Sequence, residues 1–149
     1  MCLNNWGGID HKVLEFHEYV NLFSGKSGSG KSTVMDAIQV ILYGSFSPSF
    51  LNKAADDAKN RRSVLSYLRG EQKDGSANRK DCDFCSVIAL EIEDTGTHII
   101  TCIGIAFEVR KSDSEIKKFV YFSHSGKMPE SEYLTEQGVC YSNQEIKKL

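Results

Sequence analysis

One eight-residue stretch constrains the fold of this chain more than any other. Residues Gly25–Ser32 match the pattern G-x-x-x-x-G-K-[ST] at every fixed position. In such a loop, glycines let backbone N–H groups converge on phosphate oxygens, the lysine reaches the β- and γ-phosphates, and the last hydroxyl ligates Mg²⁺. The stretch therefore predicts a phosphate-binding loop in which Lys31 neutralises phosphate charge and Ser32 holds the metal.

The residues on either side of this loop favour the same interpretation. Lys12–Phe23 has the β-branched and aromatic content of a strand that leads into the loop. After the loop, apolar residues recur at helical spacing and predict one apolar face, made of Val34, Ala37, Ile38, Ile41 and Leu42. Gly44 stands where a helix C-cap glycine is expected. A strand, a glycine loop and a helix in this order direct the positive end of a helix dipole at a phosphate, whereas a flexible Gly/Ser linker would lack both flanks.

Length and composition limit the class of protein. The 149 residues suffice for one domain with a core, and a hydrophobic content of 40% with 26% charged residues is ordinary for a globular chain. The net charge of −2 does not by itself require nucleic acid as a partner. No apolar run is long enough to span a bilayer, and Trp6-Gly7-Gly8 interrupts any secretory signal. Five scattered cysteines suit free thiols in a reducing compartment, so we expect a cytoplasmic location.

The rest of the chain predicts a helical segment followed by strands. Leu51–Gly70 reads as helical, with apolar positions at Ala54, Ala58, Val64, Leu65 and Leu68, and residues 71–83 read as a polar loop. Three strands are expected at Cys85–Glu93, His98–Arg110 and Lys118–His124, joined by short turns into an antiparallel meander. Ser142–Glu145 matches the capping box S-x-x-E and predicts a helix over 143–149. A helix this short at the last residue is at least as consistent with a chain cut from a longer one as with a natural end.

Two acidic residues are candidate partners of Mg²⁺. Asp36 follows the loop on its helix, where a surface carboxylate with a local hydrogen bond is favoured over a role in the metal shell. A P-loop ATPase also needs an acid at the end of a buried strand. The candidate is Glu91, but Leu90 and Ile92 alternate with Glu91 and Glu93, which indicates a half-solvated antiparallel strand instead. The sequence thus predicts nucleotide binding without an evident residue to drive hydrolysis.

The remaining polar clusters give weaker indications. Lys53–Lys80 holds eight basic residues against four acidic ones, which fits either a DNA-backbone contact or a solvated helix face. Cys82 and Cys85 form a lone C-x-x-C without a second pair for zinc, so incidental cysteines are favoured. The four histidines are dispersed and support neither a triad nor a metal site.

Several of these pieces together resemble one family. Asn4-Asn5-Trp6 on a short opening strand, the loop through Thr33 and the helix Met35–Gly44 resemble the N-terminal head segment of SMC-type ATPases, the group that includes condensins. Phe50–Ala55, Arg61–Gly70 and Ser86–Glu91 are similar to the MukB-like condensins, in particular to the SMC proteins of the Wadjet plasmid-defence systems. The resemblance covers nearly the whole chain, although only the loop portion is specific to nucleotide binding.

The resemblance implies a divided ATPase head. The fold class would be α/β, a P-loop NTPase of ABC/SMC head type, with residues 1–149 as its N-terminal lobe: loop and first helix at 25–44, basic helical segment at 51–80, meander at 85–124 and a helix start at 143–149. The C-terminal head half, from the same protein or a second chain, would supply the acidic strand, the signature loop and a switch histidine. Hydrolysis is therefore expected only once that half completes the site, and this chain alone is expected to be inactive.

Ligands and partners follow from the same resemblance. ATP and Mg²⁺ are the expected cofactors, Lys31 is the catalytic candidate and Ser32 the metal ligand, and the nucleotide contacts are Gly25, Lys26, Ser27, Gly28, Ser29, Gly30, Lys31, Ser32 and Thr33. DNA, kleisin-type proteins and accessory condensin proteins would be partners in the full assembly, and no membrane is expected. An arginine among Arg61, Arg62 and Arg69 would approach DNA or nucleotide, and Gln72 and Gln144 are imperfect candidates for a glutamine loop.

Three alternatives stay open at the level of sequence. A DNA-repair ATPase head of the SbcC, Rad50 or RecF kind would share the site and differ in its task. A small self-contained P-loop kinase or GTPase would use Glu91 or a nearby acid and turn over alone. A nucleotide-gated module without enzymatic activity would dock DNA through its basic residues, with an affinity that falls steeply as salt rises.

Overall fold

One five-stranded antiparallel sheet organises the fold, in a computed structural model that describes residues 1–47, 51, 63–72 and 75–149. The spatial order of the strands is β2-β1-β3-β4-β5. The strands are β1 (Cys2–Trp6), β2 (Ile9–Val13), β3 (Phe84–Glu93), β4 (Ile100–Val109) and β5 (Lys118–Ser125), and the helices are α1 (Lys31–Tyr43), α2 (Val64–Arg69) and α3 (Asn143–Ile146). The predicted meander is present as β3–β4–β5, within two residues of the expected bounds.

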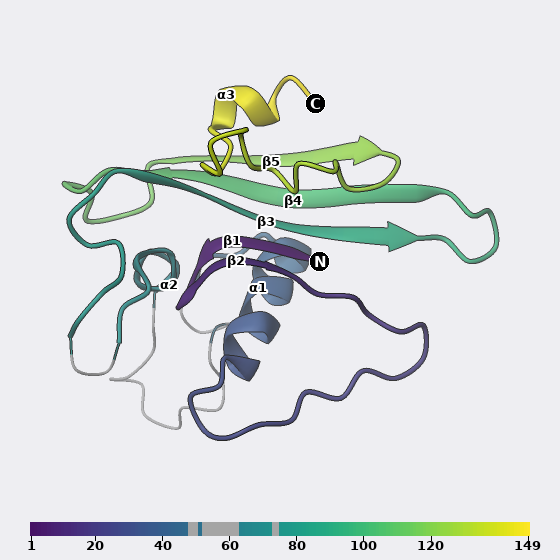
Figure 1. Cartoon of the computed structure of the whole chain (residues 1–149), viewed down its shortest axis with the longest axis horizontal. Helices are drawn as coiled ribbons and strands as arrows, with labels where there is room; N and C mark the ends of the chain where they lie inside the picture. Colours follow the sequence, from purple (N-terminus) through teal and green to yellow (C-terminus); the bar gives the residue numbers. More distant parts are fainter. Residues whose placement is uncertain (48–50, 52–62, 73–74) are drawn as a thin grey trace.

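Each face of the sheet is covered by a different part of the chain (Figure 1). Helices α1 and α2 pack on one face, where Ile88, Ile105 and Phe107 of the sheet join the larger core cluster. The segment that follows β5, together with α3, covers the other face and encloses Val87 and Ala89 in a second cluster. Because side chains alternate along a strand, the middle of β3 contributes to both cores. The sheet is therefore a central layer that is buried on both sides near β3.

Helix α1 matches the sequence prediction at both ends but not on its whole surface. It begins directly after the glycine loop and ends at Gly44, which has φ 60° and donates its N–H to the carbonyl of Val40. Val34, Ala37 and Ile41 are buried as expected. The prediction was wrong for Leu42, which is 56% exposed and lies two turns from the exposed Met35. Helix α1 therefore has apolar residues on its outer side as well as on the side that packs on the sheet.

The predicted strand over Lys12–Phe23 is largely wrong. Strand β2 ends at Val13, and the chain then forms a long loop outside the sheet that leads to the start of α1 (Figure 1). The strand-like residues of this segment are solvent-exposed, with Tyr19 at 86%, Val20 at 76% and Leu22 at 88%. In the described part of the chain no strand pairs with them. A strand needs neighbours for its backbone groups, so composition alone could not produce one here.

The helical segment predicted over Leu51–Gly70 lies only partly in the described residues. Ala54 and Ala58 fall outside them, whereas Val64, Leu65 and Leu68 are buried on α2, as predicted. Helix α2 has the expected terminal signals: the Ser63 side chain accepts from the Ser66 N–H, and Gly70 closes the helix with φ 65°. Its apolar side chains pack α2 against β1 and join the core cluster that α1 also enters.

The C-terminal helix begins where the capping box predicts. The Ser142 side chain accepts from the Glu145 N–H, and the Glu145 carboxylate accepts from the Ser142 N–H at 2.7 Å. These bonds lower the pKa of the Glu145 carboxyl, the backbone bond most. Ile146 anchors the short helix in the second core cluster.

Among the described residues, none of the helices combines the length and the hydropathy that crossing a bilayer would take.

The five cysteines are free thiols that differ strongly in burial. Burial raises the pKa of Cys2 to about 12 and that of Cys85 to about 11, and it also raises the pKa of Cys140. A raised pKa lowers the thiolate fraction at a given pH, and the thiolate is the reactive form. We therefore expect iodoacetamide at pH 8 to modify the exposed Cys82 quickly in the native protein.

All five thiols should react after denaturation in urea, and peptide mass spectrometry measures the modification at each site. Modification of native Cys140 at the rate of Cys82 would contradict the buried position of the second core cluster.

Candidate phosphate-binding site

The glycine loop has a backbone conformation that depends on its glycines. Gly25, Gly28 and Gly30 have φ angles of 151°, 85° and 88°, in the region that residues with a Cβ atom rarely occupy. At Gly25 a Cβ atom would also lie 2.7 Å from the Ser29 hydroxyl. A hydrogen bond of 3.2 Å from the Ser29 N–H to the Lys26 carbonyl closes the turn between these glycines. The two glycines that the pattern fixes, Gly25 and Gly30, and Gly28 between them thus give the loop its shape.

Lys31 is folded back over the loop that precedes it. Its ammonium group donates to the Gly25 carbonyl at 2.7 Å and to the Lys26 carbonyl at 2.9 Å, and it also contacts the Ser29 hydroxyl at 3.2 Å. These partners fix the positive charge at the mouth of the loop rather than in bulk water. An anion in the loop would find the charge already in place.

The loop feeds directly into the N-terminus of α1. Gly30 is the N-cap residue and supplies no side chain, and the first intrahelical bond runs from the Val34 N–H to the Gly30 carbonyl at 3.1 Å. The N–H groups of Lys31, Ser32 and Thr33 therefore precede the hydrogen-bond ladder and point along the positive end of the helix dipole. Ser32 is exposed there. This end of the helix offers donors and positive charge to a phosphate and an oxygen ligand to a metal.

The prediction for Asp36 was wrong. It does not lie on the helix surface but is 3% exposed, and its carboxylate accepts a hydrogen bond from the Tyr67 hydroxyl of α2. A carboxylate at such a depth requires a hydrogen-bond donor, and the donor lies 31 residues away in the sequence. Asp36 therefore joins two helices.

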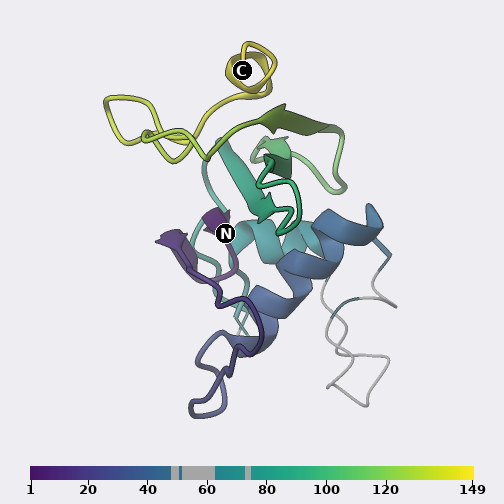
Figure 2. The same ribbon diagram turned by 90° about the vertical axis from the view of Figure 1, so that its right-hand side faces the viewer.

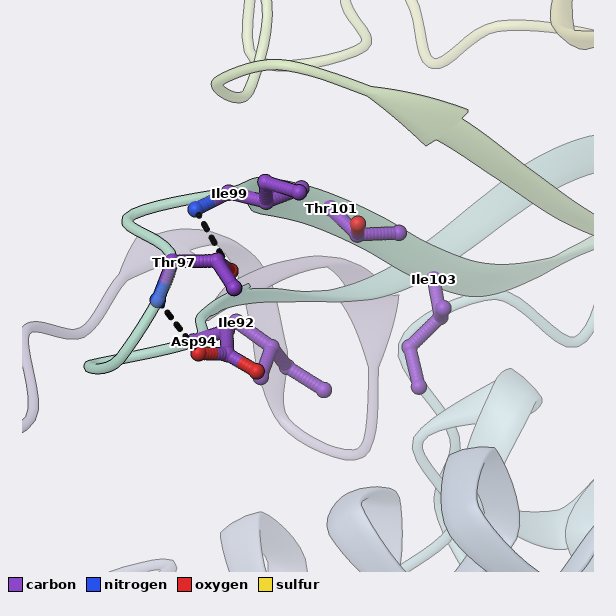
Figure 3. A pocket seen from close by; sticks show the side chains of 6 residues that line it. All are labelled: Ile92, Asp94, Thr97, Ile99, Thr101 and Ile103. Carbon is purple, nitrogen blue, oxygen red and sulfur yellow. Dashed lines mark hydrogen bonds between the residues drawn. The ribbon is translucent and has the colours of Figure 1, made fainter.

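Glu91 lies where the sequence analysis expected, on a half-solvated part of antiparallel β3. It is exposed, and its carboxylate accepts from the Met128 N–H. Beyond it, at the turn between β3 and β4, an open hollow of about 500 Å³ is lined by Ile92, Asp94, Thr97, Ile99, Thr101 and Ile103 (Figure 3). The Asp94 carboxylate accepts from the Gly96 and Thr97 N–H groups at 2.8 Å, so it stabilises the turn. Within the described chain, Asp94 is the one charged residue that lines this hollow, and its carboxylate is used by the turn.

The basic residues of the segment 53–80 do not form one cationic surface in the described residues. Arg79 is 6% exposed and donates to the Leu68 and Gly7 carbonyls and to the Asp10 carboxylate. Arg69 donates to the Asp113 carbonyl and links α2 to the turn before β5. For these two residues the structure corrects the idea of a free DNA-contacting patch. Lys53, Lys59, Arg61, Arg62 and Lys73 lie outside the described residues.

The two glutamine candidates lie in different places. Gln72 follows α2 and donates weakly to the Gly70 carbonyl at 3.4 Å. Gln144 is exposed on α3, which covers the face of the sheet opposite α1 (Figure 1). Gln144 therefore does not lie near the phosphate loop in the described structure.

Two aromatic residues next to the loop carry no chemical signal in the sequence that would mark them as part of the site. Trp6 donates its indole N–H to the Thr33 carbonyl at 2.9 Å, and Tyr67 stacks on the Trp6 ring at a centroid distance of 5.1 Å. Figure 2 shows α1 crossing beneath the sheet, and the long loop after β2 leads into its first turn. The one pointer in the sequence is the Asn-Asn-Trp of the opening strand, which is part of the family resemblance.

Comparisons with known proteins agree with the geometry of the loop. Residues 1–58 match the family described as the P-loop containing region of AAA domain. A stretch of 72 residues, 46% of this chain, is 33% identical to the SbcC component of the SbcCD nuclease from Staphylococcus haemolyticus, and it spans 6% of that protein. The chain thus corresponds to a small part of the relative that it matches. The two matches support a P-loop ATPase family of the SMC and SbcC-like kind, and a P-loop region of this kind implies nucleotide binding.

Proposed function

We propose that this chain is the ATP- and Mg²⁺-binding head segment of an SMC-like, DNA-organising ATPase. The observation that carries the proposal is the glycine loop itself: Lys31 is held over it by two carbonyls, at a helix N-terminus without a capping side chain. These are the elements that the binding of terminal phosphates requires. The match to the P-loop containing region supports the same assignment.

The residues of the loop fit ATP and Mg²⁺ in distinct ways. Gly25, Gly28 and Gly30 give the loop its shape. The N–H groups of Ser27, Gly28 and residues 30–33 would hold phosphate oxygens, while the Ser29 N–H closes the turn on the Lys26 carbonyl. Lys31 would balance the charge of the β- and γ-phosphates, and the Ser32 hydroxyl would ligate Mg²⁺. ATP supplies the phosphoanhydride bond whose cleavage drives the SMC class.

The proposal includes a second lobe that completes the head. Val20 and Leu22 lie in a segment that has the composition of a strand but no strand partners in the described chain. Met35 and Leu42 make the outer side of α1 apolar. Ile92 extends the apolar face of the sheet beyond α1. A helix that is apolar on both sides is normally covered on both. A second lobe whose strands pair with residues 20–23 would cover these surfaces. It would also supply the acidic residue at the end of a buried strand, a role that Glu91 does not fill. We propose the C-terminal head half of the same protein, or of a second chain, as this partner.

The biological task is the part of the proposal that we infer from the family resemblance. The resemblance to MukB-like condensins suggests DNA loop extrusion in plasmid defence or chromosome organisation, in the cytoplasm, with kleisin-type and accessory condensin proteins as partners. The match to the SbcC component of a nuclease favours a second candidate, a DNA-repair ATPase head. Both candidates use the same nucleotide site and differ in the segments that follow it.

Calorimetry with ATP tests the nucleotide site. We expect the chain to bind ATP more tightly with Mg²⁺ than without it, and Ser32→Ala to remove most of that difference, because the hydroxyl is lost as a metal ligand. Ser27→Ala is the matched control, since Ser27 contributes its backbone rather than its hydroxyl. Equal dependence on Mg²⁺ in both variants would contradict the role of Ser32.

Turnover separates a head segment from a self-contained enzyme. We expect no measurable ATP hydrolysis by this chain alone, whereas a complete P-loop kinase or GTPase would turn over at about 1 s⁻¹ or faster with its substrate. Hydrolysis at such a rate would contradict the proposed second lobe while leaving the nucleotide site intact.

A further inference from the structure

The start of α1 is attached to the β1–β2 turn through a buried aromatic residue. Trp6 is fully buried, and its indole N–H donates to the Thr33 carbonyl at 2.9 Å. In an α-helix this carbonyl also accepts the N–H four residues further on. Trp6 therefore adds a second donor to the helical turn from which Lys31 and Ser32 project. Strand β1 and the phosphate loop are joined at this point although they lie 27 residues apart in the sequence.

Gly7 brings the turn close enough for this contact. It has φ 60°, and a Cβ atom placed on it would lie 2.5 Å from the Thr33 methyl group. Its N–H donates to the Tyr67 carbonyl at 2.8 Å, so the same turn is also fixed to α2. The β1–β2 turn therefore touches both the first turn of α1 and the middle of α2.

Tyr67 adds a second attachment to α1, one turn further along. Its ring stacks on Trp6 with an interplanar angle of 5°, and its hydroxyl donates to the carboxylate of Asp36. Tyr67 and Asp36 are 2% and 3% exposed, so this hydrogen bond is shielded from water. Thr33 and Asp36 are both held, which restricts the rotation and the axial position of the first two turns of α1.

We propose that Trp6 and Tyr67 are positioning residues of the phosphate site, which hold the start of α1 so that Lys31 and Ser32 meet the phosphates in a fixed geometry. This inference rests on the proposed function, because it names what orients that site. A buried indole and phenol need hydrogen-bond partners in any core. Here, however, both partners lie in the two helical turns directly behind the phosphate loop, rather than elsewhere in the core.

The opposite end of α1 offers a control at a more exposed tyrosine. The Tyr121 hydroxyl donates to the Gly44 carbonyl at 2.8 Å, so this tyrosine also binds α1, but at its C-terminus. Tyr67→Phe and Tyr121→Phe each remove one hydroxyl and keep the ring. We expect Tyr67→Phe to weaken ATP–Mg²⁺ binding by about three- to ten-fold and Tyr121→Phe to leave it unchanged. Trp6 is the single tryptophan of the sequence, so a change in tryptophan emission on nucleotide binding would report on its contact with the start of α1.

A measurement without nucleotide keeps this inference separable from the proposed function. We expect amide hydrogen exchange over Val34–Ala37 to be about ten-fold faster in Tyr67→Phe than in the unaltered chain, with no such change in Tyr121→Phe. Unchanged exchange in Tyr67→Phe, or equal losses of ATP affinity in the two variants, would overturn the inference. If the unaltered chain fails to bind ATP, the proposed function fails, and hydrogen exchange still shows whether Tyr67 holds the turn.

Discussion

Replacing Lys31 with alanine is expected to weaken ATP binding by about 10- to 100-fold, because a hydrogen bond to a charged group contributes about 1.5–3 kcal/mol. The Lys31 ammonium already lies within 2.9 Å of the Gly25 and Lys26 carbonyls at the mouth of the loop. These bonds already order the side chain, so we expect little of its binding energy to be lost in ordering it when a phosphate binds. Calorimetric titration with ATP and Mg²⁺ measures the change.

Lys26→Ala is the control for this prediction. Lys26 carries the same charge in the same loop, but its side chain is exposed, and its carbonyl rather than its ammonium group takes part in the loop. We expect it to lower the affinity by no more than about three-fold, through the loss of a screened surface charge. Equal losses in the two variants would mean that general electrostatic attraction, and not the position of Lys31, accounts for binding.

Replacing Gly104 with alanine is expected to destabilise the fold by about 1–3 kcal/mol. A Cβ atom at this position would lie 2.6 Å from the Ile88 carbonyl oxygen and 2.5 Å from a carbon of the Phe122 ring. The carbonyl belongs to the neighbouring strand β3 and cannot move aside without disturbing the sheet. Urea unfolding followed by circular dichroism measures the free energy of unfolding.

Gly96→Ala is the matched control in the turn of the same hairpin. There the added Cβ atom would meet only the Asp94 side chain, at 3.3 Å, and φ is not positive. Because alanine also restricts the unfolded chain, we expect the free energy of unfolding to change by less than about 0.5 kcal/mol. A Gly104→Ala variant as stable as Gly96→Ala would contradict the packing of Phe122 over β4.

The parts of the fold that are specified locally could be predicted from the sequence. The helix after the loop, its Gly44 terminus and the capping box at Ser142 each depend on residues within one or two helical turns. The three strands of the meander are consecutive and joined by short turns, so their pairing needs no information from distant residues. Local signals were sufficient in each case.

The errors occurred where a residue depends on a distant partner. Asp36 and Arg79 are charged and therefore read as surface residues, but Tyr67 and the Gly7 carbonyl, far away in the sequence, allow their burial. The segment that includes Val20 and Leu22 has the composition of a strand, yet β1, the neighbour of β2, does not extend to it. Patterns within a segment describe what it could form, and the available partners decide what it does form.

The assignment of the phosphate site can be tested most directly by following the backbone amides of the loop during a titration with ATP and Mg²⁺. In ¹H–¹⁵N spectra we predict saturable shifts that are largest for Gly28, Gly30, Lys31 and Ser32 and that reach the Trp6 indole N–H. In Lys31→Ala the same shifts should need about 10- to 100-fold more ATP. Shifts centred on another surface, with the Gly25–Ser32 amides unmoved at saturation, would contradict a phosphate site at the start of α1.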